Sequence, residues 1–168
     1  MNHILQTERL NLRPFTHTDT KFIIELVNSP GWLQFIGDRN IKTEQQAKTY
    51  LENGPLKSYK DNGYGLWLVE RKQDNTPIGM CGIINRDYLH APDIGFAFLP
   101  DCCGQGYAHE IASATITFAH HNLNLPKLLA ITLPNNTKSI RLLEKLGMQY
   151  TETISLPNSL EKLQLFSN

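Results

Sequence analysis

The stretch from residue 93 to residue 120 constrains the fold of this chain more than any other, because its periodicity changes from strand to helix across two glycines. Residues 94–99 form a short apolar run with two phenylalanines, which is typical of a buried strand. A proline and an aspartate end that run, and Gly104 and Gly106 follow. From Tyr107 onward apolar residues recur every three to four positions, which predicts an amphipathic helix.

The turn between that strand and that helix has the features of an anion site. Gly104 and Gly106 can adopt a positive φ without strain at a Cβ atom, and they allow a ligand to approach the backbone closely. The first N–H groups of a helix have no intrahelical acceptor, and the helix dipole adds positive potential at the same end. The sequence therefore predicts that a phosphate group binds at this turn.

Two familiar phosphate loops do not match the turn. A Walker loop requires a lysine directly after its last glycine, and no lysine follows Gly106. A dinucleotide fingerprint requires a third small residue where this chain has His109, and an acid at the end of the next strand, where residues 132–134 are Thr-Leu-Pro. Both alternatives are excluded.

The composition of the whole chain narrows the class of protein. Its 168 residues suit one domain that can bury a core without disulfides or metal. The 16 basic and 16 acidic residues balance, so no charge field indicates nucleic acid or a membrane surface as a partner. The N-terminus lacks the apolar core of a signal peptide, and no stretch approaches the length of a membrane span. Three cysteines without ligand spacing favour free thiols, no metal and a cytoplasmic location.

The pattern along the rest of the chain predicts further strands and helices. Pro14 ends the first strand, and the Asn-Ser-Pro-Gly at 28–31 breaks the first helix. Residues 32–39 form an aromatic connection to the second helix, which the Asn-Gly-Pro at 53–55 ends. Gly147 stops the last helix. The expected elements are strands at 7–14, 64–70, 78–85, 94–99, 127–132, 149–154 and 160–166, and helices that begin near Thr18, Thr43, Tyr107 and Asn136.

Four segments resemble the GNAT N-acetyltransferase superfamily. Residues 101–106, Asp-Cys-Cys-Gly-Gln-Gly, are similar to its acetyl-CoA loop, Arg/Gln-x-x-Gly-x-Gly/Ala, except that Asp101 replaces the usual Arg or Gln. Residues 136–148 are similar to its Asn-x-x-Ser and Glu-Lys-Leu-Gly-Phe segment, with a methionine in place of the phenylalanine. The Thr-x-Arg-Leu-x-Leu-Arg-Pro at 7–14 and the Gly-x-Gly-Tyr-Ala-x-Glu at 104–110 resemble the branch that acetylates ribosomal-protein N-termini at alanine or serine.

The resemblance implies a fold and an activity. The fold is the α/β (α+β) acyl-CoA N-acyltransferase fold, as one domain at residues 7–168. Its mixed central sheet of about seven strands is flanked by four helices, in the order β-α-α-β-β-β-α-β-α-β-β. The activity is transfer of the acetyl group of acetyl-CoA to a primary amine, for which a protein N-terminus is one candidate, in a bacterial monomer or homodimer that releases coenzyme A. The alternatives are a small-molecule amine, such as a metabolite, polyamine or antibiotic, and a non-catalytic module that only binds acyl-CoA.

The resemblance also assigns residues to the donor site. The backbone of residues 96–99 is expected to pair with the amides of pantetheine, and Asn136, which suits a plain N-cap equally well, is expected to contact the same arm. The expected acetyl-CoA contacts are Phe96, Ala97, Phe98, Leu99, Cys103, Gly104, Gln105, Gly106, Tyr107, Ala108, Asn136 and Ser139.

Ser139 and Asp93 are expected to carry the proton transfers. In this superfamily a tyrosine seven residues after the helix-start Asn commonly protonates the leaving thiolate, but Leu143 occupies that position. The branch that this chain resembles uses a serine three residues after the Asn, which here is Ser139. Asp93 is expected to take the proton of the amine as general base. The alternative proton acceptors are Glu110, Glu152, His90 and water.

Phe35, Asp38 and Arg39 are expected to contact the amine acceptor. The resemblance implies this role, because the segment between the first two helices forms one wall of the acceptor pocket in GNAT folds. As an alternative, Trp32 and Phe35 fill the core. The identity of the acceptor does not follow from the fold, since one fold supports many acceptors.

Overall fold

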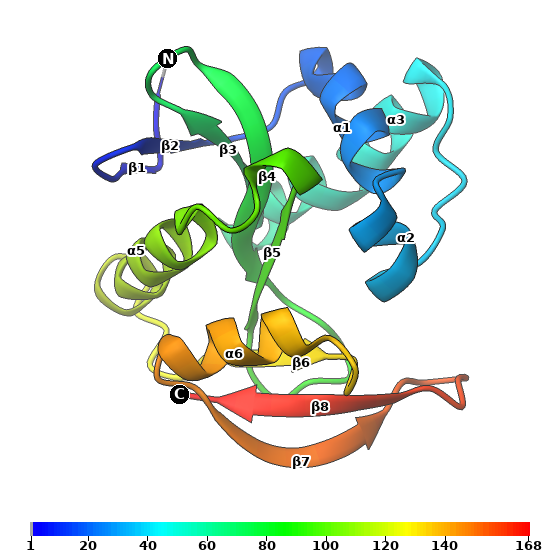
Figure 1. The fold of residues 1–168 in the computed structure, drawn as a ribbon, viewed down its shortest axis with the longest axis vertical. Coiled ribbons are helices and arrows are strands. Elements are labelled where there is room, and N and C mark those ends of the chain that lie inside the picture. The colour runs from blue at the N-terminus through cyan, green and yellow to red at the C-terminus, as the bar shows by residue number, and fades with distance from the viewer. Residues whose placement is uncertain (1) are drawn as a thin grey trace.

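The computed structural model describes residues 2–168, whose strands form a single mixed sheet (Figure 1). The strand order is β1-β2-β3-β4-β5-β6-β8-β7. Neighbouring strands are antiparallel except for β5 and β6, which run parallel. The strands are β1 (Leu5–Gln6), β2 (Leu10–Arg13), β3 (Leu66–Arg71), β4 (Thr76–Ile84), β5 (Asp93–Phe98), β6 (Leu129–Thr132), β7 (Gln149–Ser155) and β8 (Lys162–Ser167).

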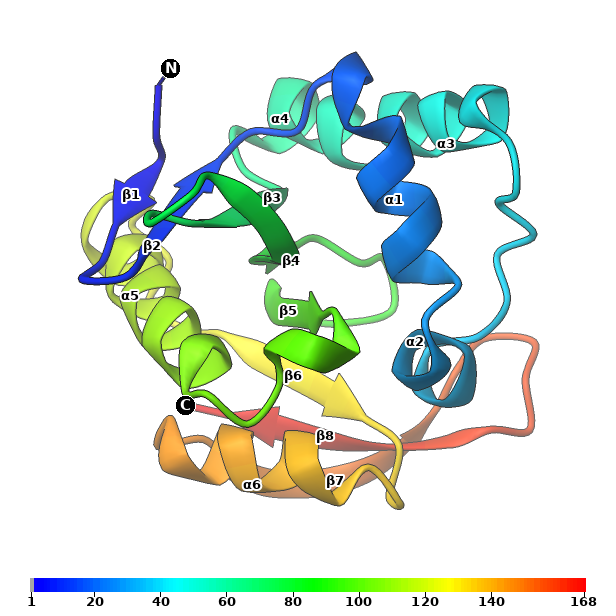
Figure 2. The same cartoon turned by 45° about the horizontal axis from the view of Figure 1, so that its top comes forward.

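Helices cover both faces of this sheet (Figure 2). The first four helices lie on one face, α5 lies on the other, and α6 contacts α5 and β6. None of the helices described is both long and apolar enough to cross a membrane. The helices are α1 (Thr20–Val27), α2 (Pro30–Phe35), α3 (Glu44–Leu51), α4 (Lys57–Asn62), α5 (Tyr107–His121) and α6 (Thr137–Lys145), with a π-helical segment (Glu52–Leu56) between α3 and α4.

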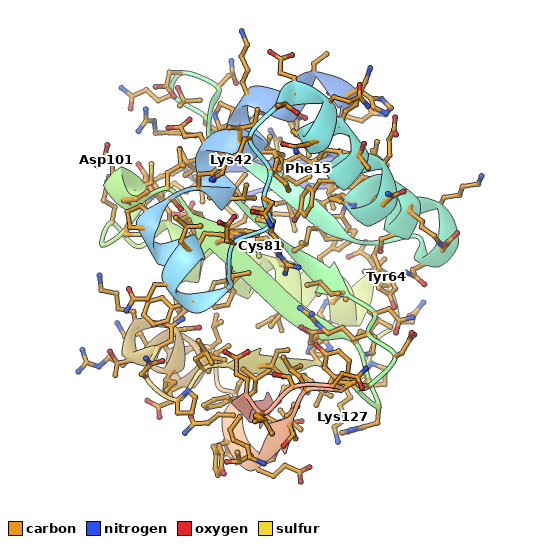
Figure 3. All side chains as sticks on the ribbon, turned by 90° about the vertical axis from the view of Figure 1, so that its right-hand side faces the viewer. Phe15, Lys42, Tyr64, Cys81, Asp101 and Lys127 are labelled. Carbon is orange, nitrogen blue, oxygen red and sulfur yellow. The ribbon has the colours of Figure 1, made fainter. Side chains whose placement is uncertain are left out.

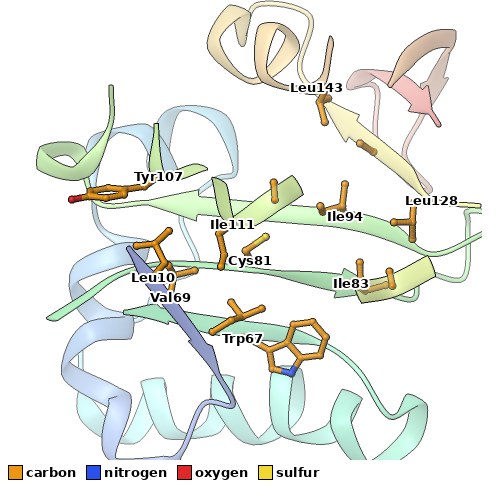
Figure 4. Packing of buried hydrophobic residues seen from close by; sticks show 14 of the residues in the cluster. Leu10, Trp67, Val69, Cys81, Ile83, Ile94, Tyr107, Ile111, Leu128 and Leu143 are labelled. Carbon is orange, nitrogen blue, oxygen red and sulfur yellow. The ribbon is translucent and has the colours of Figure 1, made fainter. Parts of the chain in front are cut away.

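The alternation of side chains along the strands produces a core on each face of the sheet. On the α5 side, Val69 of β3 and Cys81 of β4 pack in one cluster with Ile111 of α5 (Figure 4). On the opposite side, Leu68 and Met80, the neighbours of those strand residues, belong to a second cluster with side chains of α1 and α3. The central strands β3 to β5 therefore pack against side chains on both faces of the sheet.

The sheet divides between β5 and β6. The two strands pair at one register position only, Asp93 with Leu129, where the Leu129 N–H donates to the Pro92 carbonyl at 2.9 Å. Beyond this point β6 stays paired with β8, as far as Thr132 opposite Gln164, and separates from β5 (Figure 1). Within residues 2–168, the outer edge of β5 beyond Asp93 therefore has no strand partner.

The predicted mixed α/β fold is confirmed, but the expected counts of strands and helices were too low. Residues 2–168 contain eight strands rather than about seven, and six α-helices rather than four. The additional strand, β1, lies before residue 7 and pairs with β2. A strand of two residues is too short to show any periodicity, so the sequence pattern gave no signal for it.

Two helix boundaries were also predicted wrongly, and both errors concern proline. Residues 30–35 form the helix α2 instead of a connection, because Pro30 occupies the first helical position, where its missing N–H costs nothing. The predicted stop at 53–55 is not a stop, since a π-helical segment accommodates Pro55. The helix continues as α4 and ends at Gly63, whose φ is +77°.

Candidate active site

The outer edge of β5 presents free backbone groups at two residues. The Leu99 N–H donates to the Ile78 carbonyl at 2.9 Å, so Leu99 is hydrogen-bonded to β4. Hydrogen-bonded and non-hydrogen-bonded residues alternate along an antiparallel pair, and the β4–β5 register has no bulge. Phe96 and Phe98 therefore direct their N–H and C=O groups away from β4, toward the side on which β6 has separated from β5.

The turn after β5 presents a second group of free donors. A short 3-10 helix (Pro100–Cys102) leads into it, and Gly104 and Gly106 have φ values of +76° and +81°. Gly106 caps α5 without any side-chain hydrogen bond. In the described chain, the N–H groups of residues 104–108 donate to no acceptor. The turn therefore presents unpaired N–H groups at the N-terminus of α5, and phosphate binding there stays a prediction.

Arg9, which the sequence pattern did not identify, lies against this turn. Its Nη1 donates to the Gln105 carbonyl at 2.9 Å, and its Nε donates to Glu110 Oε2 at 2.7 Å. The guanidinium carbon lies 4.4 Å from the centroid of the Tyr107 ring. Gln105 and Glu110 follow Arg9 in the sequence by 96 and 101 positions, so no local pattern could indicate these contacts.

Asp93 begins β5 at the point where β5 and β6 meet. Its side chain is buried, and its Oδ1 accepts a hydrogen bond from Arg86 Nε at 3.0 Å. Burial raises the pKa of Asp93 to about 6, although the positive charge of Arg86 acts in the opposite direction. Asp93 lies on the same face of β5 as Ala97, which packs on the α1–α3 side. The carboxyl therefore titrates close to neutral pH, as a general base requires.

The alternative carboxylates and the histidine are in different environments. Glu110 is already bound by Arg9 and by the Thr7 hydroxyl, which donates to its Oε1 at 2.6 Å. Glu152 is exposed on β7, an outer strand of the sheet, and His90 is exposed in the loop before β5. Asp93 is the one of these four that is buried at the division of the sheet.

Ser139 lies in the first turn of α6, which follows β6 on the other side of the division (Figure 1). Asn136 caps this helix, and its Oδ1 accepts a hydrogen bond from the Ser139 N–H at 3.3 Å. The Ser139 hydroxyl is half-buried and has no partner within the described residues. Leu143, one turn further along, is buried in the core on the α5 side. Position 143 therefore supplies no proton donor, and the role of Ser139 as the donor stays a prediction.

The three expected acceptor contacts differ in how they are placed. Phe35 ends α2 and is half-buried, while Asp38 is exposed and its Oδ1 accepts from the Asn40 N–H at 2.8 Å. Arg39 lines a hollow of about 360 Å³ together with Tyr50 of α3. Trp32, in contrast, is buried in the core on the α1–α3 side. The alternative that these aromatic residues fill the core therefore holds for Trp32.

Comparisons with known proteins agree with this architecture. The family described as Acetyltransferase (GNAT) domain matches residues 9–149. The uncharacterized protein YkkB of Bacillus subtilis is 30% identical over 153 residues, with 89% of this chain and 87% of that protein covered. The spermidine N(1)-acetyltransferase of Vibrio cholerae is 25% identical, with 83% of this chain and 78% of that protein covered.

A solved structure is similar over nearly the whole fold. It is a ribosomal alpha-N-protein acetyltransferase in complex with coenzyme A, with a TM-score of 0.83 and 15% identity, and the match covers 99% of this chain and 97% of that one. At this identity the likeness concerns the fold. The family match, in contrast, spans most of the chain, including the division of the sheet and the turn after β5. The chain therefore belongs to the GNAT acetyltransferase family.

Proposed function

We propose that this chain transfers the acetyl group of acetyl-CoA to a primary amine at the division between β5 and β6. The observation that carries the proposal is the free backbone edge at Phe96 and Phe98, which leads directly to a turn with free amides. An extended chain with its own amides, such as pantetheine, can pair with that edge as an added strand does. The diphosphate at its end then reaches the N–H groups of residues 104–108.

Each residue at the division has one role in the reaction. Bound acetyl-CoA supplies a thioester, whose carbonyl oxygen a free N–H of Phe96 or Phe98 polarises. Asp93 accepts a proton from the amine, so that the nitrogen lone pair is free to form the new C–N bond. The C–S bond breaks, and the Ser139 hydroxyl donates a proton to the departing sulfur. The protonated amine loses two protons in all: Asp93 takes the first and later releases it to solvent. The second leaves the nitrogen as the amide forms and restores the Ser139 hydroxyl, which has given its own proton to the sulfur.

The hollow that contains Arg39 and Tyr50 favours a protein N-terminus as the acceptor. Its other lining residues are Asn40, Ile41, Gln45, Gln46 and Thr49. Arginine and amide side chains donate hydrogen bonds to peptide carbonyls, whereas a polyamine needs carboxylates, and none lines this hollow. The similar ribosomal alpha-N-protein acetyltransferase acts in the same substrate class.

A neighbouring hollow of about 410 Å³ supports a second candidate, a cationic small amine such as spermidine. It shares Tyr50 with the first hollow, and Asp61 and Asp87 are among its lining residues. Asp61 forms an ion pair with Lys57, so part of its charge is already neutralised. This pairing makes the peptide acceptor the stronger proposal.

Release of free CoA thiol from acetyl-CoA tests the proposal and separates the two acceptors. The panel contains peptides that begin with alanine or serine, the same peptides with a blocked N-terminus, and spermidine. We expect release with the free peptides and none with the blocked ones. Release with spermidine alone would select the second candidate. CoA binding without turnover on any amine would identify an acyl-CoA-binding module.

A further inference from the structure

The donor turn carries no positive side chain of its own. Residues 100–110 contain neither lysine nor arginine, and two acids, Asp101 and Glu110, flank the glycines. Asp101 is exposed at the periphery of the molecule (Figure 3). A diphosphate that binds here meets free amides and a helix dipole, but it meets no cation from within the turn. Any cation must therefore come from another part of the chain.

Arg9 reaches this turn from the connection between β1 and β2. Arg71 of β3 also lies near Tyr107, but its guanidinium is bound to Asp74 through Nε at 3.0 Å and Nη2 at 2.6 Å. The Arg9 guanidinium uses Nε for Glu110 and Nη1 for the Gln105 carbonyl. Its Nη2 has no acceptor within residues 2–168 and lies 3.3 Å from the position that a Cβ atom on Gly106 would occupy. The free N–H groups of Arg9 Nη2 thus lie beside Gly106, within the segment whose backbone amides have no acceptor.

The orientation of Arg9 is fixed by its neighbours. Glu110 Oε1 accepts from the Thr7 hydroxyl at 2.6 Å and from the Arg9 backbone N–H at 2.9 Å, while Oε2 accepts from Arg9 Nε. Burial by itself raises the pKa of Glu110, but the hydrogen bonds from Thr7 and Arg9 outweigh it and lower that pKa below its ordinary value. The ring of Tyr107 packs against the guanidinium. Glu110 is therefore an anion that holds Arg9 in place and leaves Nη2 free.

We propose that Arg9 is a ligand of the donor diphosphate, and that Thr7 and Glu110 are positioning residues for its guanidinium. The inference rests on the proposed function and extends it, because it makes the N-terminal connection part of the donor site. It also explains how the turn tolerates Asp101 at the position where the family has Arg or Gln. The positive charge comes from Arg9, 96 positions before Gln105 in the sequence.

A comparison of two donors isolates this role. CoA carries the diphosphate and pantetheine does not, so Arg9→Gln is expected to weaken CoA binding about 10- to 100-fold, the usual effect of a hydrogen-bonded charge. Turnover with acetyl-pantetheine is expected to remain at the wild-type level. The charge-matched control is Lys127→Gln, since Lys127 is exposed and lies far from Asp101 in Figure 3. Its CoA affinity is expected to equal that of the wild type.

The salt dependence of CoA binding gives a second readout that a purely structural role would not change. Wild-type affinity is expected to fall as ionic strength rises, and Arg9→Gln is expected to show a shallower slope. Equal CoA affinity in Arg9→Gln and wild type, or an equal loss with CoA and acetyl-pantetheine, would overturn the role of Arg9 while leaving the proposed function intact. Failure of the wild type to bind CoA would overturn both proposals.

Discussion

Arg86 Nε lies 3.0 Å from Oδ1 of Asp93, whose side chain is only 1% exposed. This pair stands where β5 and β6 meet, at the closed end of the division in the sheet. Two effects act on the carboxyl: burial disfavours its charge and Arg86 favours it. Burial is the larger effect, and the pKa of Asp93 is therefore raised to about 6.

The first prediction concerns the pH dependence of the reaction, which follows from the raised pKa of Asp93. A base must be deprotonated, so kcat/KM is expected to fall as pH drops through about 6. Arg86→Gln removes the charge that opposes the effect of burial, so the pKa of Asp93 is expected to rise and the acid limb to move to higher pH. The measurement is kcat/KM from pH 4.5 to 8, with the exposed Lys162→Gln as control. An acid limb that Arg86→Gln leaves in place would show that another group titrates.

The second prediction concerns the proton that the leaving sulfur receives. Ser139→Ala removes one hydroxyl, while the Ser139 backbone N–H keeps its hydrogen bond to Asn136. Turnover is expected to fall by roughly 10²–10⁴-fold, the usual effect of a positioned proton donor. The KM for acetyl-CoA is expected to stay nearly constant, because the contact matters mainly in the transition state. Steady-state kinetics check both numbers, and turnover within a few-fold of wild type would leave water as the proton source.

The third prediction concerns the stability of the region that supports the donor site. Arg13 of β2 bonds to Asp19 at 2.9 Å through both Nη atoms and to Glu70 at 2.8 Å through Nε, and all three side chains are buried. Arg13→Met leaves two buried carboxylates without their partner, so the free energy of unfolding is expected to fall by about 3–5 kcal/mol.

Urea unfolding of Arg13→Met measures that loss, and Lys57→Gln is its control. Lys57 forms an exposed i,i+4 pair with Asp61, and its removal is expected to cost about 0.3–0.5 kcal/mol. An equal loss of unfolding free energy in the two variants would mean that the buried network contributes no more to stability than a surface ion pair.

The sequence predicted the strand, turn and helix of residues 93–120 because these elements are specified locally. The apolar period changes once, and glycines mark the change. The same reasoning failed at two prolines, because a proline can either begin a helix or end one. Pro30 begins a helix and Pro55 sits within a π-helical segment, whereas the pattern treated both as breaks.

The contacts of Arg9 and Arg86 could not be predicted for a different reason. Arg9 meets Gln105 and Glu110 only because the connection between β1 and β2 lies beside the start of α5. Arg86 lies only seven residues from Asp93, yet the two meet because the chain reverses between β4 and β5. Periodicity identifies which face of a strand is buried, but it does not report which side chains meet across a connection.

The fourth prediction concerns the three cysteines, all of which are free thiols. Cys81 is fully buried, and burial raises its pKa to about 12, so its thiol is expected to stay unreactive until the protein unfolds. Cys103 is exposed and is expected to react in the native state. A reducing agent is expected to leave Tm unchanged. Thiol counts with and without denaturant, together with thermal melts, check these outcomes, and a Tm several degrees lower in reductant would reveal a disulfide.

The fifth prediction tests the central claim, that the donor binds at the turn after β5. Gly106 and Gly63 both have a positive φ, so an alanine strains the backbone similarly at either position. A Cβ atom on Gly63 meets open space, whereas one on Gly106 stands 3.3 Å from Arg9 Nη2, where the diphosphate is expected.

The most direct measurement is therefore the dissociation constant of CoA for the wild type, Gly106→Ala and Gly63→Ala, determined by calorimetry on variants shown by circular dichroism to be folded. We expect Gly106→Ala to bind CoA at least about tenfold more weakly, a difference of about 1.4 kcal/mol. Gly63→Ala is expected to bind as the wild type does. Wild-type affinity in a folded Gly106→Ala would contradict the account, because it would place the donor somewhere other than this turn.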